Sequence, residues 1–391
     1  MAASDNSISI ILTLSFLIWL SPYISKLVKI PTPPIEIILG SLVTYWGLVS
    51  THEYFDILAK VGFLYLMFLA GMEVNLKQII NSPKIILQKS LVFLALMTFF
   101  TTVLGFAFGL NAIVIVSMPL ISIGILATLS KEYGKDENWI QLAFIVGVIG
   151  EVISIAALTV IDAAIMVGFG FELLVKMGYL LLFILAIYIA YRLLRVVFWW
   201  YPELKNFLMP HDDTSDQNIR LTIALFFILI AIMLLLHLEV AFGAFIAGVA
   251  ISTFFHHEKR LEEKMSSLGF GFLVPIFFIY VGASFDLKAL ALEGIVSGAL
   301  LIMGIMIASR IAGGYVLHAI GGKSDALLAS LSLSMPLTLM IAVATIGYEV
   351  RMIDILTYYQ LILASLFEII VAMISIKLIY VLKQIAPNQL L

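Results

Sequence analysis

Long apolar runs alternate with short polar segments along almost the whole chain. The runs are about 18–28 residues long and apolar on all sides, which is the length of a helix that crosses a bilayer. A membrane-spanning β-barrel would instead show segments of about 10 residues with alternating polarity. The pattern therefore predicts a helical bundle of about thirteen transmembrane spans. The predicted spans are 7–30, 33–50, 54–73, 84–109, 111–130, 137–166, 171–200, 218–236, 239–256, 266–284, 289–318, 325–347 and 357–384.

The composition agrees with this pattern and excludes several other classes of protein. Of the 391 residues, 62% are hydrophobic and 12% are charged, and the mean hydropathy is +1.13. This leaves too little polar side chain to cover a soluble protein of this size, so we expect an all-α integral membrane protein in a lipid bilayer. Nucleic-acid binding is excluded by the same arithmetic. The chain has no Cys and no nucleotide-binding, zinc-binding or hydrolase motif, so we expect no enzyme, no cofactor and no resident metal.

The positions of Lys and Arg predict the orientation in the membrane. If the N-terminus lies outside, most of the 22 basic residues fall in inside loops or at the inner ends of helices. Such a bias is typical of the cytoplasmic side. We therefore expect the N-terminus outside and the C-terminus in the cytoplasm.

The two halves of the chain resemble each other. Ser117-Met118-Pro119-Leu120 recurs as Ser334-Met335-Pro336-Leu337, and Glu151 matches Glu368 at the same spacing of 217 residues. Helices 1–6 and 8–13 are therefore interpreted as two copies of a six-helix unit joined by the seventh helix. Because the first copy starts outside and the second starts inside, the repeats are inverted, as in many secondary transporters.

Two prolines fall inside apolar helices at equivalent positions of the repeats. Pro119 and Pro336 each remove a backbone donor and clash with the preceding turn. A single proline can be tolerated as a kink, but a matched pair favours two broken helices whose freed carbonyls and helix dipoles face each other near the bilayer midplane. We place the breaks at Ser117 and Pro119 and at Ser334 and Pro336. The hydroxyls of Ser122 and Thr128 are candidate ion ligands.

Three charged residues lie near the centres of predicted helices, where a charge costs about 2.5–3.5 kcal/mol on insertion scales. We interpret Glu151 as the carboxylate that binds the proton or the ion, because it lies in the helix after a broken one. It can hold a proton or a small cation but not both, and this competition is sufficient for antiport. Arg310 and Glu368 are interpreted as a structural ion pair, with Glu151 as the alternative partner of Arg310. Glu36 lies nearer a helix end and is expected to be solvated, or to line an entry funnel.

Several segments resemble one transporter family. Pro33-Pro34 with Leu39-Gly40, LAGMEVNL at 69–76, GAFIAG at 243–248 and PIFFIYVGAS at 275–284 resemble motifs of the monovalent cation:proton antiporters. This clade includes the Kef-type and bacterial sodium/proton exchangers. At the ion site the family usually has Asn-Asp, Asp-Asp or Gln-Asp, whereas this chain has Gly150-Glu151.

The resemblance implies that different parts of the chain form different domains. It implies a scaffold or dimer domain from 1–80 and 218–288, a mobile transport domain from 81–170 and 289–391, and a linker helix with a cytoplasmic loop over 171–217. It also implies a homodimer, elevator-like alternating access, a bacterial inner membrane and a role in pH homeostasis. Because the chain ends at Leu391, we expect the transmembrane domain alone, without the nucleotide-binding regulatory domain of Kef-type proteins.

These observations together predict an antiporter that exchanges protons for sodium or potassium. Gly150 offers no second acid, and the guanidinium of Arg310 stays charged at any working pH, so we expect one-for-one, electroneutral exchange. A gated cation channel or efflux pathway is one alternative, and a transport-inactive sensor or scaffold is another. The residues do not separate sodium from potassium, because both ions bind carboxylate, hydroxyl and carbonyl oxygens.

Overall fold

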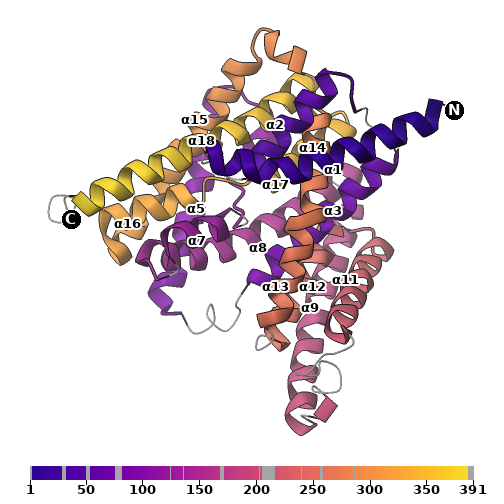
Figure 1. The fold of residues 1–391 in the computed structure, drawn as a ribbon. Coiled ribbons are helices and arrows are strands. Elements are labelled where there is room, and N and C mark those ends of the chain that lie inside the picture. Colours follow the sequence, from indigo (N-terminus) through magenta and orange to yellow (C-terminus); the bar gives the residue numbers. More distant parts are fainter. Residues whose placement is uncertain are drawn as a thin grey trace. The chain divides into compact units, whose positions relative to one another are not determined.

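All regular elements in the residues that the computed structural model describes are helices (Figure 1). The described ranges are 2–28, 32–49, 53–74, 82–123, 125–134, 136–167, 171–201, 203–204, 216–238, 240–255, 259–285 and 287–385. Two compact units are present. The first comprises Met1–Ile57, Gln78–Ile155 and Pro275–Leu391, and the second comprises Leu58–Lys77 and Ala156–Val274.

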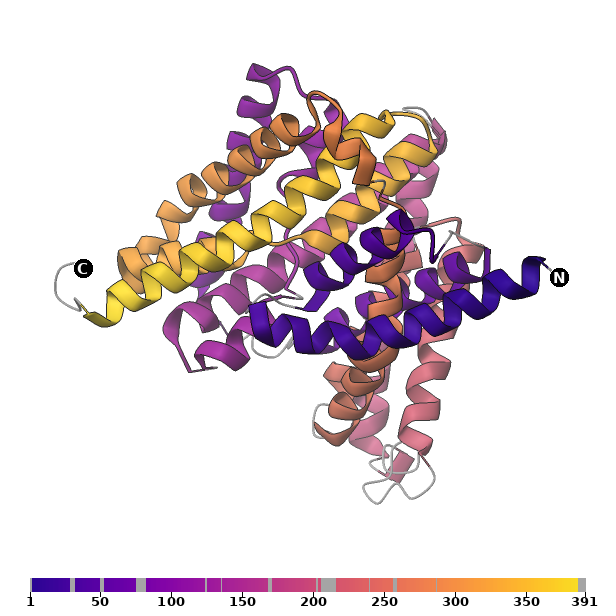
Figure 2. The same cartoon turned by 45° about the horizontal axis from the view of Figure 1, so that its top comes forward.

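The first unit contains most of the helices, and α18 packs along α15, α16 and α17 within it (Figure 2). Its helices are α1 (Ala2–Val28), α2 (Thr32–Tyr45), α5 (Lys84–Ala107), α6 (Ala112–Ser117), α7 (Leu126–Tyr133), α15 (Ile295–Gly314), α16 (His318–Ser332), α17 (Leu337–Glu349) and α18 (Ile355–Ile385), with the short 3-10 turns η2 (Leu287–Ala291) and η3 (Tyr315–Leu317).

The second unit is smaller. Its helices are α9 (Phe171–Trp200), α11 (Gln217–Leu235), α12 (Val240–Phe254) and α13 (Lys259–Leu268), followed by the π-helical turn η1 (Gly269–Leu273). Three further helices contribute residues to both units: α3 (Glu53–Glu73), α8 (Asn138–Val167) and α14 (Val274–Ala283).

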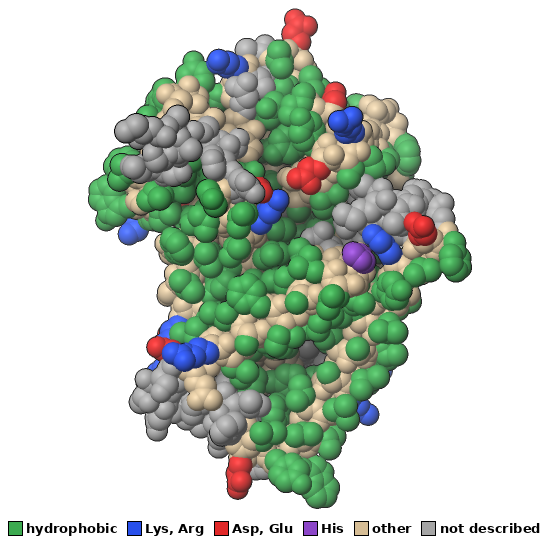
Figure 3. Space-filling view, turned by 90° about the vertical axis from the view of Figure 1, so that its right-hand side faces the viewer, with side chains coloured by type: hydrophobic (Ala, Val, Ile, Leu, Met, Phe, Trp, Pro, Cys, Tyr) green, Lys and Arg blue, Asp and Glu red, His purple; other side chains and the backbone are tan. Residues whose placement is uncertain are grey.

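The surface is that of an integral membrane protein. Nine helices in the described ranges are long and apolar enough to cross a bilayer. Large apolar side chains such as Leu181, Leu234 and Phe106 are more than half exposed, and hydrophobic side chains make up much of the face shown in Figure 3. A surface of this kind is stable in lipid, where exposed apolar side chains cost nothing.

Several helix boundaries differ from those predicted by hydropathy, two of them near Lys259 and Ile295. The span predicted over 266–284 begins earlier, at Lys259. The segment before residue 266 is polar but consists of strong helix formers, so it extends the helix towards the N-terminus as α13. The span predicted over 289–318 starts as the separate turn η2, and α15 begins only at Ile295. Gly294 precedes it in a left-handed conformation with φ of 91°, which ends the regular structure before it.

The two helices that carry matched prolines are interrupted. α6 ends at Ser117 and α7 begins at Leu126, so the described residues 118–123 and 125 belong to the first break, which contains Pro119. α16 ends at Ser332 and α17 begins at Leu337, and Pro336 directly precedes α17. The first break is thus longer than the second by several non-helical residues.

Glycines bring two helix pairs into backbone contact. In the first unit, a Cβ on Gly40 of α2 would overlap the carbonyl oxygen of Ile279, and a Cβ on Gly282 of α14 would overlap that of Ile37. In the second unit, Gly71 of α3 and Gly248 of α12 meet backbone carbonyls in the same way. Close approach of this kind is typical of small residues at membrane helix interfaces.

Candidate ion-binding site

The carboxylate of Glu151 lies at the first helix break. Glu151 is fully buried on α8. Its Oε2 accepts a hydrogen bond from the backbone N–H of Ile123 at 3.3 Å, and its Oε1 accepts one from the hydroxyl of Ser122 at 3.4 Å. Both donors are neutral, and among the described residues Glu151 forms no ion pair.

Small residues allow α8 to lie against the break. A Cβ on Gly150 would stand 2.7 Å from Ile121 Cδ1, and one on Gly147 would stand 2.6 Å from Ile123 Cγ2 and 2.9 Å from Leu333 Cδ2. The residue before Glu151 therefore faces the apolar side chain of Ile121. A longer polar side chain at position 150 would have to displace Ile121.

The guanidinium of Arg310 connects the two breaks. Its Nη2 donates to the carbonyl oxygen of Leu120 at 2.8 Å, and its Nε donates to that of Leu333 at 3.3 Å. Its Nη1 lies 3.1 Å from Glu368 Oε1, and both side chains are fully buried. Because Nη1 and Oε1 are not aligned as a hydrogen bond, charge attraction holds this pair.

The charges at the site match the ends of the broken helices. Carbonyl groups at the C-terminal end of a helix carry partial negative charge, and N–H groups at an N-terminal end carry partial positive charge. Arg310 contacts Leu120, which follows α6, and Leu333, which follows α16. Glu151 contacts Ile123, which precedes α7. Arg310 therefore contacts carbonyl groups on the C-terminal side of α6 and α16, and Glu151 contacts an N–H group on the N-terminal side of α7.

The other residues predicted at the breaks make local contacts or lie outside the described residues. The hydroxyl of Ser117 donates to Val114 O at 2.8 Å, and that of Ser334 donates to Ser330 O at 3.4 Å, so each bonds to the helix before its own break. Pro119 is part of the first break. The side chain of Thr128, on α7, lies outside the described residues.

Ser154 belongs to the site and was not predicted. Its hydroxyl accepts a hydrogen bond from the backbone N–H of Ile121 at 2.9 Å, and the side chain is buried. Its spacing of three residues from Glu151 places both side chains on one face of α8. That spacing was a usable signal, because Glu151 was already a candidate.

The prediction of a solvated Glu36 is wrong. Glu36 is 3% exposed, and its carboxylate accepts a hydrogen bond from the hydroxyl of Ser21 at 3.0 Å. The helix end is covered because α1 packs along α2, which hydropathy along the chain does not reveal.

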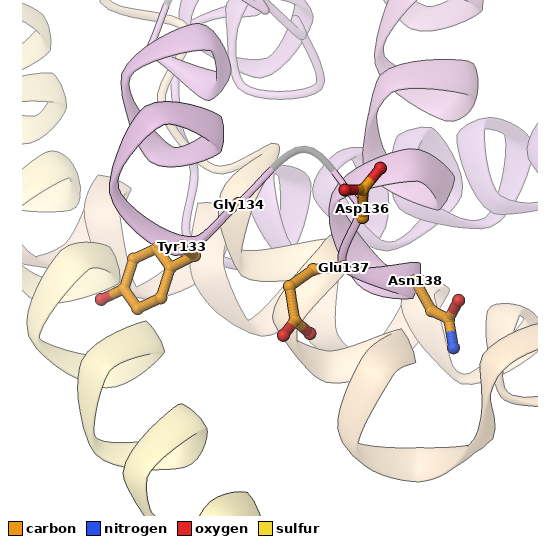
Figure 4. Close-up of a pocket in the computed structure, with 5 residues that line it drawn as sticks. All are labelled: Tyr133, Gly134, Asp136, Glu137 and Asn138. Atoms are coloured by element: carbon orange, nitrogen blue, oxygen red, sulfur yellow. The ribbon is translucent and has the colours of Figure 1, made fainter.

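A shallow pocket of about 360 Å³ lies at the far end of α7, where the chain turns into α8 (Figure 4). Asp136 and Glu137 line it, but their carboxylates point in different directions. Glu137 accepts a hydrogen bond from Tyr380 and lies 3.9 Å from Lys383. At about 1.5 Å per helical residue, this pocket is about 20 Å from Glu151 along α8.

In the described ranges no group of three His, Asp or Glu side chains could hold a resident metal.

Comparison with known proteins identifies relatives across the chain. The family model described as sodium/hydrogen exchanger, transmembrane, matches residues 11–382. "Putative Na(+)/H(+) antiporter YjbQ" of Bacillus subtilis is 26% identical over 402 residues, covering 96% of this chain and 63% of that protein. The high-affinity Na+/H+ antiporter NhaS3 of Synechocystis is 28% identical over 295 residues, covering 71% of this chain and 60% of that protein. The chain thus spans less than two thirds of the length of these relatives.

A solved structure shares the fold. The sodium proton antiporter MjNhaP1 of Methanocaldococcus jannaschii superposes with a TM-score of 0.66 at 13% identity, over 100% of this chain and 98% of that one. The prediction of an all-α membrane fold is confirmed by this match, and the family resemblance is confirmed by the family model. The chain belongs to the sodium/hydrogen exchanger family, a family of integral membrane transporters and not of enzymes.

Proposed function

We propose that the chain is a secondary antiporter that exchanges protons for sodium, with Glu151 as the group that binds either one. The observation that carries this proposal is the buried carboxylate of Glu151, held only by the neutral donors Ser122 and Ile123 among the described residues. An isolated carboxylate charge is unfavourable in the membrane interior. A proton or a monovalent cation relieves this cost, and only one of them can do so at a time.

The relatives support sodium as the cation, since their names describe Na+/H+ antiporters. The test is cation-driven recovery of a quenched pH dye in proteoliposomes, with sodium, potassium and lithium added in turn. Sodium is expected to give the strongest response. A stronger response to potassium would identify potassium as the transported cation. Dissipation of gradients without uphill exchange would indicate a channel, and no response with any cation would indicate a transport-inactive protein.

Exchange is expected to be electroneutral. Arg310 and Glu368 cancel each other's charge at 3.1 Å, so the charge of the site depends on Glu151 alone. Protonated Glu151 and cation-loaded Glu151 are both neutral. A membrane potential contributes about 2.3 kcal/mol per moved charge per 100 mV, and here no net charge moves. The sodium gradient at equilibrium should therefore stay unchanged when a potassium–valinomycin potential is imposed. A clear shift would show that a second acid, with Glu368 the first suspect, also titrates.

We propose elevator-like movement of a transport domain (81–170 and 289–391) against a scaffold domain (1–80 and 218–288), in a homodimer with its C-terminus in the cytoplasm. Phe285, which follows α14, belongs to the scaffold in this division. Its ring lies 4.9 Å from that of Tyr359 on α18, which belongs to the transport domain. The charge pattern assigns both residues to the outer side. This contact would close the outer side and would have to separate during transport.

Cross-linking these two positions is expected to stop exchange. The chain has no Cys, so Phe285→Cys with Tyr359→Cys can be joined by a short, reducible, bifunctional thiol reagent without side reactions. Exchange should be lost on cross-linking and should return on reduction. The control pair is Tyr348→Cys with Tyr358→Cys, whose rings lie 5.3 Å apart within the transport domain, and its cross-link should leave exchange intact. Full activity in the first cross-linked protein would contradict the movement.

A further inference from the structure

Resting on the function proposed above, we propose that Ser154 is a positioning residue of the ion site. It clamps one peptide group of the first helix break and thereby holds Ser122 and Ile123 against Glu151. The role requires contact with the break and not with the ion.

The clamp acts on the peptide group between Leu120 and Ile121. The N–H of this group belongs to Ile121 and donates to Ser154 Oγ at 2.9 Å. Its carbonyl belongs to Leu120 and accepts from Arg310 Nη2 at 2.8 Å. Because a peptide group is planar and rigid, contacts at both ends fix its orientation. Ser154 and Arg310 come from different helices, α8 and α15, so this peptide ties both helices to the break.

The clamped peptide adjoins the residues that touch Glu151. Ser122 and Ile123 follow it directly, and their hydrogen bonds to Glu151 are long, at 3.4 and 3.3 Å. Hydrogen bonds of this length are weak and suit a carboxylate that exchanges a proton for a cation. The shorter hydrogen bond between Ser154 and the N–H of Ile121 holds this part of the break in place more firmly than the long bonds to Glu151 can.

Among its described residues, the second repeat has no counterpart of this clamp. At the spacing of 217 residues, Ser154 corresponds to Val371, and residues 121–123 correspond to 338–340. Residues 338–340 lie inside α17, whereas 121–123 are non-helical. In the first break, α8 supplies Ser154 and Glu151 as acceptors for the N–H groups of Ile121 and Ile123. The clamp thus accompanies the ion site and is not a general feature of the repeated architecture.

The test compares Ser154→Ala with Ser154→Thr. Alanine removes the acceptor and leaves a buried N–H without it, whereas threonine keeps the hydroxyl. If the cost of the unsatisfied N–H falls on the sodium-bound state, it lowers the affinity for sodium by about tenfold. In proteoliposomes we expect Ser154→Ala to raise the KM for sodium about tenfold with a smaller change in maximal rate. Ser154→Thr should restore the KM to near the wild-type value.

A matched control separates positioning from general stability. Ser90 is also buried, on α5, and its hydroxyl donates to the carbonyl of Ile86 in its own helix. Ser90→Ala should leave the KM for sodium unchanged. The proposal is overturned if Ser154→Ala retains the wild-type KM, or if threonine fails to restore it.

A second readout does not depend on transport. Binding of sodium to the folded protein raises its unfolding temperature in detergent, and the sodium concentration that gives half of this rise should be about tenfold higher for Ser154→Ala. If the wild-type protein binds sodium but exchanges nothing, the proposed function fails and the clamp is still tested. If the wild-type protein shows neither binding nor exchange with sodium, both proposals fail.

Discussion

Replacing Glu151 with Gln is expected to reduce cation/proton exchange to the level of empty liposomes. Glutamine has the size of glutamate and can still accept the N–H of Ile123, so the local structure should be retained. It cannot take up a proton or supply the negative charge that a cation needs. The measurement is the sodium-dependent response of a pH dye in proteoliposomes, together with the unfolding temperature in detergent.

The control for this variant is Glu172→Gln. Glu172 is an exposed carboxylate in the first turn of α9, so its replacement should leave exchange at the wild-type rate. Wild-type exchange by Glu151→Gln, in a protein that also retains its unfolding temperature, would remove Glu151 from the transport mechanism.

Breaking the Arg310–Glu368 pair is expected to have the largest effect on stability. Removing one partner of a buried ion pair costs about 3–5 kcal/mol, because the other charge stays buried without compensation. Glu368→Gln leaves the guanidinium charged, since arginine does not lose its proton. Arg310→Met also leaves the carbonyls of Leu120 and Leu333 without a donor.

A double-mutant cycle isolates the pair. The double variant, Arg310→Met with Glu368→Gln, should lose less stability than the two single variants added together. We expect the difference from additivity to be about 1–3 kcal/mol. The measurement is the free energy of unfolding in a detergent titration. We expect the double variant to show no exchange, because Arg310 no longer donates to the carbonyl groups of the two breaks. Additive effects of the two substitutions would argue against the ion pair.

Apolar run length and matched motifs were sufficient to predict the broad architecture. The spans, the helical class and the interruptions at Pro119 and Pro336 all follow from signals that local sequence carries. Glu151 stood out for the same reason, because a charge inside an apolar run has few explanations.

The contacts that organise the site could not be predicted in this way. Arg310 binds the carbonyls of Leu120 and Leu333, and every residue type carries a carbonyl, so no sequence pattern marks these two. Ser154 accepts a backbone N–H of the non-helical first break, and every residue type except proline carries such a group. Glu36 is buried by a neighbouring helix, and such burial depends on packing rather than on position along the chain.

The glycine contacts between α2 and α14, and between α3 and α12, also constrain how the sequence can vary. A backbone carbonyl group of the facing helix leaves no room for a larger residue at Gly40, Gly282, Gly71 or Gly248. A second substitution cannot remove this clash, because every residue type carries a backbone carbonyl. A library of variants at these positions should therefore yield almost no functional protein and no compensating pairs. Gly178 on α9, where a Cβ would meet nothing, should accept many residues. Glycine thus occupies both positions that cannot vary and positions that can.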